Sequence, residues 1–346
     1  MYHPRFKGSH YDIGLKFGKI LKKQKIDFDK IISLDDFQKD FGKKSQTVLS
    51  NIFPEVCDEI RGMTDGLNYP YEKFASWLLC MGCCYDPKGC TAFCFINNNN
   101  VFYGRNNDLP PFLKRVSLSA LYKPKNGYSF IGNTSSTINF EEGLNEKSLA
   151  VAMTFLVPKK IVPGLSSVFL VRYLLEKCAT TKEAINALQS LPIASPCNII
   201  LADKTSDMVV AECTTDEIFL RKPATDENFI VAANHFPSNE MKNYNASNWH
   251  NLIYSSDTRY KTAYNALKKI DYSDGVEHAK DILSGKHGFM CQYDKKLNFD
   301  TIWSSVFDIS NSKIYRAEGN PARTKFKEDT RFNRGVLKKK NSIKSK

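Results

Sequence analysis

Residues 86–108 of this 346-residue chain read DPKGCTAFCFINNNNVFYGRNND. The first four residues favour a turn, and residues 92–96 alternate in the manner of a β-strand. Four asparagines follow at the length of a hairpin loop, and residues 101–104 have the composition of a second strand. The stretch therefore predicts a β-hairpin that begins just after Gly89.

The turn before this hairpin places a thiol, that of Cys90, beside the carbonyl group of the preceding residue. Gly89 has no side chain to shield that carbonyl. Attack by the thiol would convert the peptide bond to a thioester, and water would then release a new N-terminus. The freed α-amine has a reference pKa of about 8 and can act as the base for its own thiol. We therefore predict self-cleavage between Gly89 and Cys90, with Cys90 as the nucleophile.

Two charged residues lie on the second strand of the predicted hairpin. Arg105 and Asp108 follow Cys90 by 15 and 18 residues. A hairpin of this length returns the end of its second strand to the start of its first, so both charges are expected beside the thiol. The cation would favour the thiolate form, and the carboxylate could orient the new ammonium group. A surface ion pair of little energetic value is the simpler alternative.

The remaining sequence divides at the hairpin. Before it, apolar residues recur at helical spacing in residues 11–21, 48–63 and 71–81, with an interruption at Pro54. After it come strand-like segments, a pair of helices, more strands, two more helices and a closing hairpin. The helices are expected at residues 166–178, 181–191, 259–269 and 275–283. The strands are expected at residues 116–122, 128–132, 149–155, 198–203, 208–213, 229–233, 303–308 and 313–317. Such blocks predict two packed antiparallel sheets with helices outside.

The composition narrows the class of protein. With 42% hydrophobic and 25% charged residues, the chain is of ordinary globular composition. The N-terminus lacks the apolar core of a signal peptide, and no run of about 18 apolar residues predicts a membrane span. Ten cysteines fit a reducing compartment if most are free thiols. We therefore expect a cytoplasmic protein without stable membrane insertion.

The formal net charge of +12 is concentrated toward the C-terminus. Residues 324–346 contain nine Lys and Arg against Glu328 and Asp329, a net charge of +7. A basic run of this kind favours a flexible, solvated tail. Because no basic motif interleaved with aromatic residues occurs in the body of the chain, we expect no nucleic-acid partner.

Several separated pieces resemble the penicillin acyltransferase family of N-terminal-nucleophile hydrolases and its relatives, the choloylglycine (bile salt) hydrolases. Residues 89–91, Gly-Cys-Thr, are similar to the family's processing site, and residues 104–108 resemble the Gly-Arg-Asn-x-Asp that follows the nucleophile. Asn145 opens an Asn-Glu-Lys turn similar to one in bile salt hydrolases. Asn234 follows a strand, and Arg259 opens a helix, as in the family. The helical segment before the nucleophile resembles the acyltransferase branch, in which a propeptide becomes a small subunit.

The resemblance implies an α+β fold, the four-layer αββα sandwich of N-terminal-nucleophile hydrolases, with a helical N-terminal segment. It implies that Cys90 is the nucleophile and, through its α-amine, the base. Asp108 would hold that amine, and Arg105 and Arg259 would tune the thiol and hold the site together. Asn234 would donate its side-chain amide to the oxyanion.

Asn145 would also lie at the site if the bile salt branch applies, and a plain turn asparagine is the alternative. The resemblance divides the chain into a helical propeptide or small subunit (1–89), a catalytic domain (90–323) and a basic tail (324–346). The substrate would be a linear amide or an acyl thioester, and no cofactor is required. Hydrolase and acyltransferase stay open, because the choice depends on how the site excludes water.

Three other interpretations compete with this one. Five crowded cysteines suggest a metal site; they are Cys80, Cys83, Cys84, Cys90 and Cys94. Only one pair of them has Cys-x-x-Cys spacing, so no metal is expected. A papain-like arrangement would need His235 or His250 as the base, and no papain-type motif surrounds the nucleophile. A non-catalytic basic scaffold of the same fold is the third.

Overall fold

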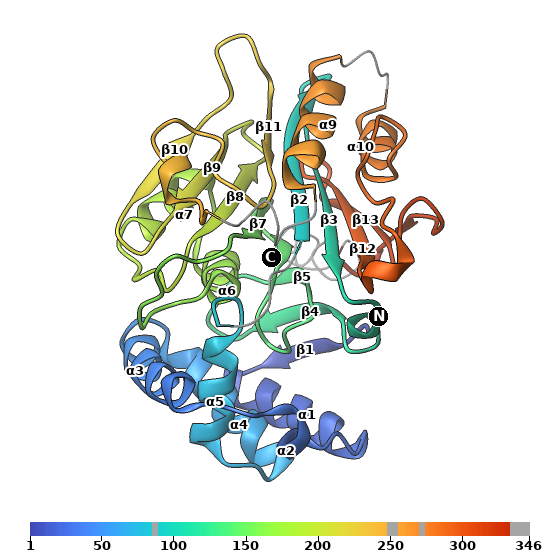
Figure 1. Ribbon diagram of the computed structural model, residues 1–346. Helices are drawn as coiled ribbons and strands as arrows, with labels where there is room; N and C mark the ends of the chain where they lie inside the picture. Colours follow the sequence, from blue (N-terminus) through green and yellow to red (C-terminus); the bar gives the residue numbers. More distant parts are fainter. Residues whose placement is uncertain (85–88, 248–254, 270–273, 333–346) are drawn as a thin grey trace, which may run out of the picture.

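The computed structural model describes residues 1–84, 89–247, 255–269 and 274–332. Its strands form two sheets, drawn in Figure 1. The larger has the order β1-β4-β5-β6-β7-β8-β9-β10, and the smaller has the order β11-β2-β3-β12-β13-β14. The strands of the larger sheet are β1 (Arg5–Gly8), β4 (Leu118–Pro124), β5 (Phe130–Thr134), β6 (Glu142–Asn145), β7 (Leu149–Phe155), β8 (Cys197–Asp203), β9 (Met208–Cys213) and β10 (Ile218–Arg221). Those of the smaller sheet are β2 (Gly89–Asn97), β3 (Asn100–Leu109), β11 (Phe229–Ala232), β12 (Asp300–Asp308), β13 (Lys313–Ala317) and β14 (Lys327–Glu328).

Two layers of helices cover the outer faces of the sheets. On the larger sheet, α6 (Ser167–Lys177) and α7 (Thr181–Leu188) pack over a core shared with the N-terminal helices. On the smaller sheet, α9 (Ser256–Lys268) and α10 (Gly275–Leu283) cover the aromatic residues of β2 and β3. A third core of mostly aliphatic side chains lies between the sheets. The predicted four-layer αββα sandwich is confirmed.

The hairpin predicted from the asparagine run is present as β2 and β3. Asn97 pairs with Asn100, and Asn98 and Asn99 adopt left-handed φ angles of 49° and 60°. Asparagine tolerates this conformation better than most residues, and two successive left-handed residues match the twist of the flanking strands. The local sequence thus fixes the register of the hairpin.

The N-terminal segment folds into five helices below the sandwich in Figure 1: α1 (His10–Lys23), α2 (Phe28–Ile31), α3 (Asp36–Ile52), α4 (Pro54–Leu67) and α5 (Tyr71–Cys80). Glycines let α1 and α4 approach closely. A Cβ atom at Gly14 of α1 would lie 1.9 Å from the carbonyl oxygen of Glu59, and one at Gly62 of α4 would lie 2.1 Å from that of Tyr11. Side chains at these glycines would force the two helices apart.

Several boundaries differ from the sequence-based expectations. The segment 1–89 is not wholly helical, because β1 pairs in parallel with β4 and Gly89 already belongs to β2. The short strands β6 and β10 were not predicted as strands. A four-residue strand gives a clear pattern when it is an uninterrupted apolar run, as β11 is, but charged or polar residues at the ends of β6 and β10 interrupt that run.

The start of the flexible tail was also predicted too early in the chain, at residue 324. Residues 327 and 328 form β14, which pairs with β13, and Asp329 lies 2.7 Å from the Arg316 guanidinium. Arg331 donates to the Ser119 carbonyl at 2.8 Å, and Phe332 is buried. The composition suggested solvation, but these contacts hold residues 327–332 on the sandwich.

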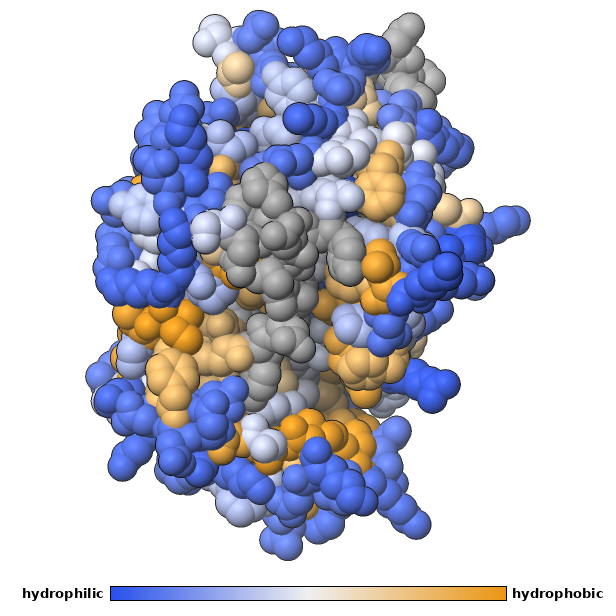
Figure 2. Space-filling view, in the orientation of Figure 1, coloured by the Kyte–Doolittle hydropathy of each residue, from blue (hydrophilic) through white to orange (hydrophobic). Residues whose placement is uncertain are grey.

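The view in Figure 2 shows mainly hydrophilic side chains over the top and sides of this face. Hydrophobic side chains gather in its lower half, where the N-terminal helices meet the sandwich. Among the described helices, none combines the length and the apolar character needed to cross a membrane.

Candidate active site

The thiol of Cys90 lies near the start of β2, a strand flanked by β11 and β3. Along β2, Ala92 and Cys94 face the core between the sheets, whereas Phe93 and Phe95 face α9 and α10. Because side chains alternate along a strand, Cys90 faces the larger sheet. Its exposed fraction is 1%. The strand therefore buries the thiol between the two sheets.

Asn234, two residues beyond the end of β11, contacts both the backbone and the thiol of Cys90. Its Oδ1 accepts hydrogen bonds from the Cys90 backbone N–H at 3.0 Å and from Nη2 of Arg259 at 2.7 Å. Its Nδ2 donates to the Phe155 carbonyl oxygen at 2.8 Å and contacts Cys90 Sγ at 3.4 Å. The amide thus joins Cys90 to the end of β7.

Arg259, in the first turn of α9, binds the backbone of Cys90 from the outer side of the sheet. Its Nη1 donates to the Cys90 carbonyl oxygen at 2.7 Å and to Oγ1 of Thr91 at 2.6 Å. The same nitrogen lies 3.7 Å from Oδ2 of Asp108. The fully buried guanidinium therefore links α9, β2 and β3 around the predicted cleavage site.

Asp108, near the end of β3, pairs with Gly89 in the ladder. Its carboxylate accepts hydrogen bonds from Oγ1 of Thr301 at 2.6 Å and from the Tyr293 hydroxyl at 2.9 Å. Complete burial raises the pKa of Asp108, and the charge of Arg259 offsets part of that rise. Sequence reasoning missed Thr301 and Tyr293. Thr301 lies just before the strand expected at residues 303–308, and only the pairing of β12 with β3 places it opposite Asp108; the loop that holds Tyr293 carried no signal.

Arg105 pairs with Ala92 in the hairpin, so its side chain faces the larger sheet, as the thiol does. Its Nε donates to the Met153 carbonyl oxygen at 3.3 Å, and its Nη2 lies 3.8 Å from Oε2 of Glu141. In the described part of the chain, neither terminal nitrogen has a hydrogen-bond partner. Burial alone would lower the pKa of Arg105, but Coulomb interactions with Cys90, Glu142 and other nearby groups raise the pKa above its usual value. The cation therefore lies within electrostatic reach of Cys90.

The sequence model of the family described as acyl-coenzyme A:6-aminopenicillanic acid acyl-transferase matches residues 96–323. The chain belongs to this family. The match includes Arg105, Asp108, Asn234 and Arg259 and begins after Cys90, so the predicted cleavage site lies outside it. Membership confirms the resemblance to penicillin acyltransferases and identifies the chain as an acyl-transfer or amide-hydrolase enzyme of the N-terminal-nucleophile type.

More distant likenesses come from solved structures. Penicillin V acylase from Agrobacterium tumefaciens is 17% identical over 66% of this chain and 83% of its own, with a TM-score of 0.47. Two variants of the conjugated bile acid hydrolase from Clostridium perfringens are each 13% identical over 69% of this chain and 96% of theirs, with TM-scores of 0.48 and 0.49. A search of curated proteins found no match. The family assignment rests on the family match alone.

Asn145 lies outside this candidate active site. Its Nδ2 donates to the carbonyl oxygens of Leu175 and Cys178 at 3.1 and 2.8 Å, and its Oδ1 accepts from the backbone N–H groups of Lys147 and Leu149, each at 3.0 Å. These bonds tie the β6–β7 turn to the end of α6. The other end of β7, about 20 Å along the strand, is the one that contacts Asn234. The structure therefore contradicts a role for Asn145 at the site and makes it a turn asparagine.

The histidine required by a papain-like mechanism is engaged elsewhere. Nδ1 of His235 lies 2.8 Å from Oγ of Ser256, and Nε2 lies 3.4 Å from Oδ1 of Asp257. Both ring nitrogens therefore have partners other than the thiol. His250 lies outside the described residues.

The crowded cysteines do not share one site. Cys80 and Cys83 pack at the end of α5, where their thiols donate to backbone carbonyl oxygens at 3.4–3.5 Å, and Cys94 lies in the core between the sheets. Within the described residues, no group of three or more His, Cys, Asp or Glu is arranged to hold a metal ion. The absence of a bound metal stays a prediction.

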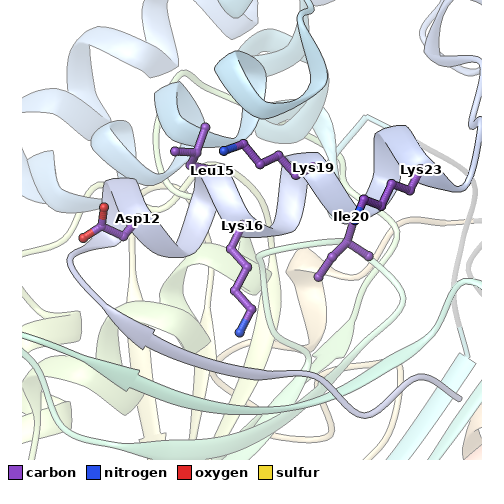
Figure 3. Close-up of a pocket in the computed structure, with 6 residues that line it drawn as sticks. All are labelled: Asp12, Leu15, Lys16, Lys19, Ile20 and Lys23. Atoms are coloured by element: carbon purple, nitrogen blue, oxygen red, sulfur yellow. The ribbon is translucent and has the colours of Figure 1, made fainter.

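A hollow of about 360 Å³ lies along α1 and is lined by residues in the range 12–23, none of which belongs to the candidate active site. Figure 3 shows Lys16, Lys19 and Lys23 extending from this helix beside two aliphatic side chains. Lys16 is already engaged, because its Nζ donates to the Arg5 carbonyl oxygen at 3.1 Å. The residues that line the hollow include no thiol and no histidine, so the hollow is not a candidate site for acyl transfer.

Proposed function

We propose that this chain is a cysteine N-terminal-nucleophile enzyme that cleaves itself between Gly89 and Cys90 and then cleaves or transfers the acyl groups of linear amides. The observation that carries the proposal is the binding of one amide, Asn234, to both the backbone N–H and the thiol of Cys90. The N–H is the group that cleavage would convert to the catalytic amine. A structural cysteine in a strand would need an acceptor for its N–H but no side-chain amide beside its thiol.

Self-cleavage would begin when Cys90 Sγ attacks the carbonyl carbon of Gly89. The C–N bond breaks as the C–S bond forms, which leaves a thioester and a free α-amine. Water then hydrolyses the thioester to give a carboxylate at Gly89 and the thiol of Cys90. Arg259 holds the carbonyl oxygen of Cys90 itself, so the strand beyond the cleaved bond would keep its position.

The same thiol would then act on the substrate. The α-amine takes the thiol proton, and the thiolate attacks the acyl carbon of the amide. Asn234 Nδ2 would donate to the oxyanion, and the positive charge of Arg105 would favour the anionic nucleophile. The leaving amine takes the proton from the α-ammonium group. The acyl-enzyme then passes its acyl group to water or to an acceptor amine.

Asp108 would act on the α-amine rather than on the thiol. It pairs with Gly89, whose bond to Cys90 would be cleaved to create the amine, and Nη1 of Arg259 contacts both the Cys90 carbonyl oxygen and the Asp108 carboxylate. The carboxylate would hold the ammonium group during the reaction. Its bonds from Thr301 and Tyr293 fix its orientation.

The N-terminal fragment would stay bound as a subunit after cleavage. Strand β1 adds a parallel edge to the larger sheet. Buried charges also cross the boundary, because Arg172 of α6 donates to Glu59 of α4 at 2.7 Å and Glu176 lies 2.9 Å from Nε2 of His10. Separation of the two pieces would leave Glu59 without its cation and would expose the bond between Glu176 and His10, whereas Arg172 and Glu176 would keep each other.

Intact-mass spectrometry of the purified protein tests the proposal. We expect two pieces, one of 89 residues and one of the remaining 257, and a single uncut chain for Cys90→Ala. A wild-type protein that stays uncut yet is fully active would refute the mechanism, because the α-amine base would not exist.

A further inference from the structure

Asn107 lies directly opposite Cys90 in the β2–β3 ladder. Side chains of directly opposite residues lie on the same face of a sheet, with Cβ atoms about 4.5–5.5 Å apart. The Asn107 amide therefore lies on the thiol's side of the smaller sheet. It is the variable position of the Gly-Arg-Asn-x-Asp motif at residues 104–108, and none of the roles above uses it.

The side-chain nitrogen of Asn107 has no hydrogen-bond partner within the described residues, although the residue is 99% buried. Its neighbour Asn106, on the opposite face, is fully engaged. Asn106 Nδ2 donates to the Leu283 carbonyl oxygen at 3.0 Å, and its Oδ1 accepts from the Ser304 hydroxyl at 2.6 Å. Because a buried donor without a partner costs free energy, the Asn107 amide is suited to a partner that arrives with the substrate.

The other donor beside the thiol is partly committed. Asn234 Nδ2 has two hydrogens, one directed to the Phe155 carbonyl oxygen and one to Cys90 Sγ. Only the second can turn to an oxyanion without breaking the bond to β7. Strand β2 lies between β11 and β3, so Asn234 and Asn107 flank the thiol from opposite sides.

We propose that Asn107 is a catalytic residue that donates its side-chain N–H to the oxyanion, opposite the N–H of Asn234; this rests on the function proposed above. As the Cys90 thiolate forms its bond to the acyl carbon, the carbonyl π pair moves to oxygen, and both amides bind that oxygen. When the pair returns, the C–N bond breaks, and the leaving amine takes the proton held by the α-amine. Neither asparagine gains or loses a proton.

Two reactions of the same thiol separate this role from thiol activation. Acylation of Cys90 by p-nitrophenyl acetate passes through an oxyanion, whereas alkylation by iodoacetamide displaces iodide and forms none. Self-cleaved Asn107→Leu should lose about 10²-fold in acylation rate, the effect of one missing oxyanion donor, and should keep the wild-type alkylation rate. Asn100→Leu, at the far end of the same strand, is the matched control and should keep both rates. Mass spectrometry of the Cys90 peptide distinguishes it from the other cysteines.

Equal loss of both rates, or loss of neither, would overturn the oxyanion role. If Asn107→Leu does not fold and cleave, Asn107→Ala makes the same comparison with a smaller side chain. Failure of both variants to release the Cys90 amine would also overturn the proposal, because it would assign Asn107 to maturation. A wild-type protein whose Cys90 is neither released nor acylated would instead refute the function proposed above.

Discussion

Replacing Asn234 with alanine removes an amide that joins Cys90, the α9 guanidinium and the end of β7. Its Oδ1 binds the Cys90 N–H and Arg259, and its Nδ2 binds the Phe155 carbonyl oxygen and the thiol. The substitution therefore affects catalysis through one contact and stability through the other three.

The contacts set the expected magnitudes. Loss of one oxyanion donor lowers turnover about 10²–10³-fold, equivalent to roughly 2.7–4 kcal/mol. Substrate binding should weaken much less, because the oxyanion exists only once the acyl carbon is attacked. The Phe155 carbonyl oxygen loses its amide donor in a buried site, so the free energy of unfolding should fall by about 1–3 kcal/mol.

Burst kinetics with a chromogenic amide report formation of the acyl-enzyme directly. A panel of N-acyl amino acids of short and long chain, bile salts and penicillins supplies candidate substrates. Only cleaved Asn234→Ala protein is compared with wild type. Asn228→Ala is the control. Asn228 is exposed just before β11, the strand that Asn234 follows, and within the described residues its side chain donates to the Ile96 carbonyl oxygen. If Asn234→Ala turns over like wild type, the proposed oxyanion site is wrong, although the family assignment would stand.

Asp108→Asn should accumulate uncleaved chain on an intact-mass spectrum, because the neutral amide lacks the negative charge that would stabilise the α-amine as the C–N bond to Gly89 breaks; cleavage at the wild-type rate would contradict that role. Burial lowers the pKa of His278 to about 4, so its contribution to stability is fully present above pH 6.5 and is lost as the pH falls toward 4. Urea unfolding at pH 7 and pH 5 should show this loss in wild type and a smaller one in His278→Leu, and equal pH dependence would refute it. Arg172→Met leaves Glu59 and Glu176 buried without their cation, a cost of about 3–5 kcal/mol. The two cleaved pieces should then separate on gel filtration, whereas wild-type pieces should elute together, and co-elution of the variant pieces would argue against a charge-dependent interface.

The β2–β3 hairpin shows which features of the site can be predicted from neighbouring residues alone. Strand alternation and the asparagine turn are short-range features, and together they fix which residues of β3 oppose Gly89 and Cys90. The proximity of Arg105 and Asp108 to Cys90 therefore followed from one hairpin. The αββα layering followed from the order of strands and helices, because each element must bury its apolar face.

The partners from distant parts of the chain did not follow from the residues themselves. Asn234 and Arg259 lie 144 and 169 positions after Cys90, and only the family resemblance pointed to them. The same resemblance suggested Asn145, which the structure places at the opposite end of β7.

The sequence by itself determined the hairpin, the alternation of the strands and the segments that form the principal helices, since these depend on neighbours a few residues apart. Only the tertiary structure decided that residues 327–332 are held on the sandwich by Arg316 and Ser119. It also decided that Thr301 and Tyr293 orient Asp108, and that the Asn107 nitrogen is buried without a partner. These features depend on which strands become neighbours and which side chains meet across a layer, and no short stretch of sequence encodes either.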